Sequence, residues 1–136
     1  MIGLLILAEK KLGGGLLAAV EHTLGSRPPQ LAAIDLDYDI APERMDALIR
    51  QALQNIDGGD GALILADVYG ATHTNVACRL LARGRIELVA GVNLPMLLRV
   101  LNYRNLQMDD LIDKALSGGC GGIVCAGDPS KIREAR

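Results

Sequence analysis

The sequence predicts a single α/β domain with a mainly parallel sheet and helices on both faces. Short apolar runs alternate along the chain with longer segments whose apolar residues recur at helical spacing, and this alternation is typical of a parallel sheet crossed by helices. Half of the 136 residues are hydrophobic, and neither Phe nor Trp occurs. A core of Leu, Ile, Val and Ala suits strands that are buried on both faces.

The order of the elements follows from the positions of the apolar runs. Strands are predicted at residues 2–8, 31–36, 62–66 and 86–90, with a last short strand at 123–125. Helical spacing predicts helices at residues 13–24, 42–56, 73–82, 94–101 and 108–116. The glycines of residues 118–122 predict a flexible turn. We expect one domain over residues 1–127 and a loose polar tail over residues 128–136.

Composition excludes several classes of function. The formal net charge is −2 and the charges are scattered, so nucleic acid is not an expected partner. No apolar run reaches the roughly 18 residues that a membrane span needs, and the first residues lack the basic region of a signal peptide. The three cysteines, an odd number, favour a reducing cytoplasm. The spacing of Cys78, Cys120 and Cys125 matches no metal site, and we expect neither a metal nor a cofactor.

Polar residues follow the third predicted strand, at the edge of a parallel sheet where binding sites lie. Asp67 ends this strand, and Thr72 is a candidate N-cap of the next helix. The backbone N–H groups of Gly70, Ala71 and Thr72 could hold an anion at the helix start. The same pattern also fits a simple capped turn, so spacing alone leaves both interpretations open.

Three segments of the chain carry a resemblance to a known family. Residues 66–72 read Ala-Asp-Val-Tyr-Gly-Ala-Thr and are followed by Asn75. Residues 90–98 read Ala-Gly-Val-Asn-Leu-Pro-Met-Leu-Leu. These two segments are similar to the second signature and to the third, most distinctive signature of the mannose-family enzyme IIA of the bacterial sugar phosphotransferase system. Residues 1–7 resemble the first strand of that family, and the resemblance extends to about residue 118.

The resemblance implies a flavodoxin-like arrangement, a homodimer and a role as a phosphate carrier. In this family a histidine after the first strand accepts phosphate from HPr and passes it to a IIB partner. An aspartate holds the imidazole, and a hydroxyl at a helix start, together with backbone N–H groups, receives the phosphoryl oxygens. Asp67 and Thr72 occupy those two positions. Sugar specificity does not follow, because a IIA component handles phosphate and not sugar.

The first departure from the family is at the acceptor position, where the alignment of the first strands places Glu9. A carboxylate could form an acyl phosphate, although an ionised Asp67 nearby would repel it. Glu9 also resembles a permanently charged substitute for phosphohistidine, with fewer oxygens and less charge. The sequence does not distinguish a natural silent relative from a variant engineered at this position.

The second departure is His73, which stands where the family usually has proline. His73 could be a relocated acceptor, because it is the one histidine predicted near the site. The interpretation we favour from the sequence is a solvated residue at the helix start. His22 falls on the polar side of its helix and is expected at the surface.

A glycine run offers an alternative from another class of function. Residues 13–18 fit the pattern G-x-G-x-x-A, and Asp35 or Asp37 follows about 20 residues later, as in dinucleotide-binding domains. Residues 9–12 separate these glycines from the strand, which argues against that fingerprint. A Walker loop is excluded because no Lys-Ser or Lys-Thr follows. The prediction is therefore a IIA-like protein that is regulatory or inactive in the ordinary relay because Glu9 replaces the acceptor histidine. The alternatives are an active phosphate carrier that uses His73 or Glu9, and a small nucleotide-binding domain.

Overall fold

The computed structural model describes residues 1–37 and 39–128 and confirms the predicted α/β class. Within these residues, parallel strands form one sheet in the order β2-β1-β3-β4. The strands are β1 (Gly3–Glu9), β2 (Leu31–Leu36), β3 (Ala62–Ala66) and β4 (Ile86–Ala90). The helices are α1 (Leu12–Leu24), α2 (Pro42–Ile56), α3 (Thr72–Cys78), α4 (Leu94–Asn102) and α5 (Met108–Gly121).

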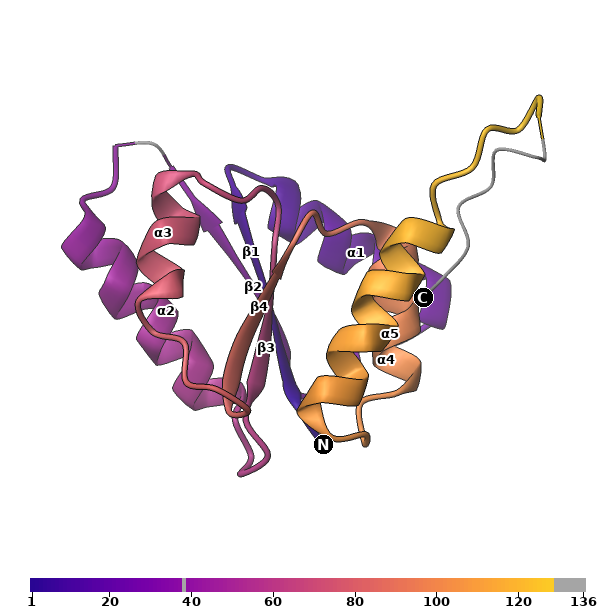
Figure 1. Ribbon diagram of the computed structural model, residues 1–136. Helices are drawn as coiled ribbons and strands as arrows, with labels where there is room; N and C mark the ends of the chain where they lie inside the picture. The colour runs from indigo at the N-terminus through magenta and orange to yellow at the C-terminus, as the bar shows by residue number, and fades with distance from the viewer. Residues whose placement is uncertain (38, 129–136) are drawn as a thin grey trace.

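The sheet lies between two layers of helices. Helices α2 and α3 cover one face, and α1, α4 and α5 cover the other (Figure 1). Side chains of β1 belong to the hydrophobic cores on both faces of the sheet, because successive side chains of a strand point to opposite faces. Leu4 and Ile6 pack with α1, α4 and α5, whereas Leu5 and Leu7 pack with α2 and α3.

The strand order reverses between β1 and β3. The chain passes from β1 to β2 on one side and then returns to place β3 on the other side. Ligands of open α/β sheets bind where the strand order reverses in this way. The switch point places the residues that follow β1 and β3 next to each other.

The third helix is shorter than predicted and begins one residue earlier. Ala71, not Thr72, is its N-cap residue, and Thr72 is the first residue inside the helix. The helix ends at Cys78 instead of Ala82, because Ala82 forms an antiparallel bridge with Ile86. That bridge turns the chain back into β4.

The last helix is longer than predicted and includes most of the glycine run. Residues 118–121 lie in α5, so the predicted flexible turn is wrong, and residues 123–125 form no strand. The cause is close packing on α4. A Cβ on Gly118 would lie 2.6 Å from Cβ of Arg99, and one on Gly119 would lie 2.8 Å from Cε of Met96. The tail predicted over residues 128–136 falls, apart from Asp128, outside the described residues.

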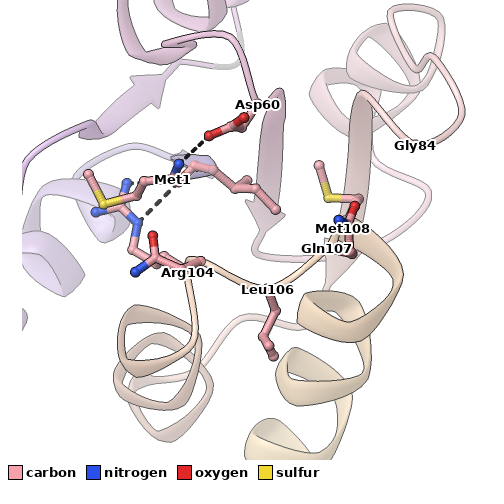
Figure 2. A pocket seen from close by; sticks show the side chains of 9 residues that line it. Met1, Asp60, Gly84, Arg104, Leu106, Gln107 and Met108 are labelled. Carbon is pink, nitrogen blue, oxygen red and sulfur yellow. Dashed lines mark hydrogen bonds and ion pairs between the residues drawn. The ribbon is translucent and has the colours of Figure 1, made fainter.

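Arg104 fastens the amino ends of β1 and β2. Its buried guanidinium donates hydrogen bonds to the carbonyl oxygens of Ile2 (2.9 and 3.1 Å), Pro29 (2.5 Å) and Gln30 (2.7 Å). Figure 2 shows this edge, where Arg104 and the ion pair between the Met1 ammonium and Asp60 line a small polar hollow. Hydrogen bonds thus anchor the amino ends of these strands, whereas the predicted site lies at the carboxyl ends.

Candidate functional site

Glu9 and Asp67 meet at the switch point, as their positions after β1 and β3 predict. Glu9 is the last residue of β1, and Asp67 directly follows β3. The two strands pair in parallel, and the Asp67 N–H donates to the carbonyl oxygen of Leu7 at 3.1 Å. The Asp67 carboxylate then turns back and accepts the backbone N–H of Glu9 at 3.0 Å.

Both oxygens of the Asp67 carboxylate accept hydrogen bonds. Oδ2 accepts the Glu9 N–H, while Oδ1 accepts the Val68 N–H at 2.8 Å and lies 2.6 Å from Nε2 of His73. Burial acts to raise the pKa of Asp67, but the hydrogen bonds from His73, Glu9 and Val68 outweigh it and bring this pKa below its ordinary value. Asp67 is therefore ionised near neutral pH, and Nε2 of His73 carries the proton that it shares with Oδ1.

His73 is buried, so its interpretation as a solvated helix-start residue is wrong. The residue is 1% exposed, and its Nδ1 lies 3.6 Å from Oε1 of Glu9. His73 shares the buried face of α3 with Val76 and Ala77, three and four residues later. That helical spacing was the signal in the sequence that indicated burial. His22, in contrast, is exposed as expected.

The loop between β3 and α3 is held by its own hydrogen bonds. Oγ1 of Thr74 donates to the carbonyl oxygen of Val68 at 2.5 Å, and Gly70 takes a φ of +93°, which favours glycine. Thr72 and Gly70 are exposed, and Ala71 is half-buried. The residues predicted to receive phosphoryl oxygens thus lie at the end of this loop and at the accessible first residue of α3.

Exposed apolar side chains follow Glu9 and Asp67 in the chain. Leu12 begins α1 three residues after Glu9, and Val68 and Tyr69 follow Asp67. All three are exposed, and Tyr69 is 75% accessible. Glu9 itself keeps 28% of its side chain exposed. A partly exposed carboxylate and exposed apolar side chains at the ends of neighbouring strands fit contact with another protein better than a closed pocket for a small molecule.

The glycine run at the start of α1 is occupied by a carboxylate of the chain itself. Oδ1 of Asp35 accepts the Gly14 N–H at 3.0 Å, and a Cβ on Gly13 would lie 2.7 Å from the same oxygen. A pyrophosphate group placed at this helix start would meet that negative charge. The contact therefore disfavours the dinucleotide-binding alternative.

Metal ligation finds no support in the described residues. Residues 1–37 and 39–128 contain no group of three or more His, Cys, Asp or Glu side chains arranged to hold a metal ion. Cys78 is half-buried, Cys120 and Cys125 are exposed, and all are free thiols. No helix in the same part of the chain has the length and apolar character needed to cross a membrane.

Two curated relatives match parts of the chain. The "PTS system fructose-specific EIIA component" of Bacillus subtilis (strain 168) is 42% identical over 71 residues, which cover 49% of each protein. The "PTS system mannose-specific EIIAB component" of Escherichia coli (strain K12) is 33% identical over 92 residues, which cover 62% of this chain and 28% of that one. The matched part thus spans half or less of each relative.

Solved structures share the fold at low sequence identity. Phosphotransferase system component EIIA from Streptococcus agalactiae superposes with a TM-score of 0.83 at 24% identity, covering 93% of this chain and 98% of that one. The mannose/sorbose specific IIA subunit from Enterococcus faecalis gives 0.81 at 19% identity, covering 94% and 96%. These neighbours support the flavodoxin-like arrangement.

A family model covers most of the chain and includes Glu9, Asp67 and His73. It is described as "PTS system fructose IIA component" and matches residues 3–116. The chain therefore belongs to the EIIA-man family of phosphotransferase-system IIA proteins.

Proposed function

We propose that this chain is a IIA-family protein that binds HPr or a IIB partner but carries no phosphate in the ordinary relay. In this proposal Glu9 stands at the position of the acceptor histidine and presents a permanent negative charge. The observation that carries the proposal is the contact of both His73 ring nitrogens with carboxylates, 2.6 Å to Asp67 and 3.6 Å to Glu9.

A phosphoryl acceptor needs a free nucleophilic nitrogen that a partner protein can reach. Nε2 of His73 is hydrogen-bonded to Asp67, and the ring is 1% exposed. Transfer from HPr to His73 would require this ring to leave its contacts with Asp67 and Glu9. Burial thus argues against the alternative of a carrier with a relocated acceptor at His73.

Glu9 is also a poor acceptor in this setting. An acyl phosphate on Glu9 would add negative charge beside Asp67, whose carboxyl pKa is held below its ordinary value against the effect of burial. Repulsion between these like charges disfavours the phosphorylated form. The unmodified carboxylate, in contrast, already supplies a negative charge at the switch point.

The proposed docking surface consists of Glu9, Leu12, Val68 and Tyr69. Its aromatic and aliphatic side chains are exposed, and interface energy is commonly concentrated on aromatic side chains. The exposed loop of Gly70, Ala71 and Thr72 continues this surface. A homodimer and a cytoplasmic location are further parts of the proposal, and free cysteines are typical of a reducing compartment.

Calorimetric titration with purified HPr and with a mannose-type IIB domain tests the docking surface. The parent should bind at least one of them, and Tyr69→Ala should weaken that binding about tenfold, which is the effect of losing one aromatic anchor. Tyr103→Ala is the matched control, because Tyr103 is also exposed but follows α4 at the opposite edge of the sheet. Absence of binding to both proteins, or equal losses in the two variants, would contradict this surface.

A further inference from the structure

The two ring nitrogens of His73 have different partners at different distances. Nε2 lies 2.6 Å from Oδ1 of Asp67, which is a short hydrogen bond. Nδ1 lies 3.6 Å from Oε1 of Glu9, which is longer than a hydrogen bond. Neutral imidazole carries one N–H, whereas protonated imidazole carries two. Whether Nδ1 can donate a hydrogen bond to Glu9 therefore depends on whether the ring carries its second proton.

The neutral ring has its proton on Nε2. Oδ1 of Asp67 already accepts the Val68 N–H, and Oδ2 accepts the Glu9 N–H, so this carboxylate acts as an acceptor throughout. An ionised Asp67 can only accept from His73, which fixes the Nε2–H tautomer. The lone pair of Nδ1 then faces an oxygen of Glu9. Two acceptors form no hydrogen bond, so the neutral ring leaves Glu9 unattached.

We propose that proton uptake at Nδ1 of His73 is a switch that attaches Glu9 to α3, and that proton loss releases it. The added N–H donates to Oε1 of Glu9 and closes the 3.6 Å gap to a charge-assisted hydrogen bond. The proton comes from solvent, and no other bond changes. Uptake also halves the net negative charge of the three side chains, since Glu9 and Asp67 are both carboxylates.

Other charged groups near α3 lie closer to the surface. The elements packed against α3 are α2 and β1. Glu43 and Asp46 of α2 line a surface hollow together with Arg79, which follows α3. Lys10 follows Glu9 and is exposed. In the described part of the chain, the carboxylates within ion-pair distance of His73 are those of Glu9 and Asp67, so these two dominate the response of the ring.

The switch deepens the proposed function and rests on it for its biological consequence. Above its transition, His73 leaves the Glu9 carboxylate free to turn toward a partner. Below it, Glu9 is held against α3 and its charge is partly neutralised. Binding of a basic partner surface at Glu9 should therefore strengthen as pH rises through this transition.

NMR titration of the isolated protein tests the switch without any partner, so its outcome is separate from that of docking. Side-chain carboxyl carbons of glutamate and ring nitrogens of histidine are followed from pH 4 to pH 8. The Glu9 carboxyl carbon should show a step that coincides with the titration of the His73 ring. Ring couplings above that step should report the Nε2–H tautomer.

Variants identify the source of the step. His73→Gln should abolish the step at Glu9, whereas His22→Gln should retain it, because His22 is exposed on α1. A step that persists in His73→Gln at the pH where the His73 ring titrates in the parent would overturn the proposal, whereas protonation of the carboxyl group itself at lower pH is expected in both proteins. An Nδ1–H tautomer in the parent at high pH would overturn it as well, and that observation needs no variant to fold.

Discussion

At the scale of single residues, the Asp67 carboxylate organises the site because three N–H groups converge on it. Two come from the backbone of Glu9 and Val68, and the third from the ring of His73. These donors lower the pKa of Asp67 despite burial, so the ionised form is favoured in the folded protein. Loss of this charge would affect both the neighbouring strand end and the start of α3.

Asp67→Asn should destabilise the fold by about 1–3 kcal/mol at pH 7, because an amide group must place N–H donors against backbone donors. The folded-state pKa of Asp67 is depressed, so its stabilisation is complete above the ordinary carboxyl value of 3.8 and is lost as pH falls through the folded value. Urea unfolding of both proteins at pH 7 and at pH 3 measures this. If Asp67→Asn is less stable than the parent by the same amount at pH 7 and at pH 3, the charge of Asp67 is not the cause of the destabilisation.

At the scale of elements, α5 shows how glycine can serve a helix interior. Glycine costs a helix about 1 kcal/mol relative to alanine, so a run of glycines normally indicates a turn. Here Gly118 and Gly119 face α4, where Arg99 and Met96 leave no room for a Cβ. Close packing of α4 on α5 compensates for the low helix propensity of these residues.

Gly118→Ala should therefore destabilise the protein by roughly 1–3 kcal/mol despite the better helix propensity of alanine, since its Cβ would lie 2.6 Å from Cβ of Arg99. Gly15→Ala is the matched control, because Gly15 lies in α1 with nothing within 4 Å of the added carbon. That change should stabilise by about 0.5–1 kcal/mol. Thermal and urea unfolding measure the change in stability of each variant relative to the parent. A change of the same sign in both variants would refute the packing argument.

At the scale of the whole molecule, the two edges of the sheet have different roles. The amino edge is fixed by buried Arg104 and by the turn after α2, where Asp57 accepts N–H groups of Gly59 (2.8 Å) and Gly61 (3.0 Å). The carboxyl edge carries Glu9, Asp67 and His73. In the proposed function this edge carries the docking surface, and sites of open α/β sheets lie beyond the carboxyl ends of strands.

Much of this architecture could be predicted from the sequence, because apolar runs and helical spacing are local signals. The meeting of Glu9 and Asp67 was predictable as well, since both follow strands of a parallel sheet. The length of α5 could not be predicted, because the glycines at its end are accommodated by close packing against side chains of α4, which local sequence patterns do not show. The burial of His73 was missed for a related reason: position in the first turn indicated solvent, while the spacing to Val76 and Ala77 indicated the core.

Transfer of phosphate is the measurement that tests the central claim most directly. The protein is incubated with phosphoenolpyruvate, enzyme I and HPr, and its intact mass is recorded beside Glu9→His and the double variant Glu9→His/His73→Ala. The parent should gain no phosphate. The double variant should gain one phosphate. Glu9→His alone should react at least about tenfold more slowly than the double variant, because His73 is still hydrogen-bonded to Asp67 and keeps that carboxylate from orienting the new histidine. Phosphorylation of the parent, at His73 or at Glu9, would contradict the account and identify a working carrier.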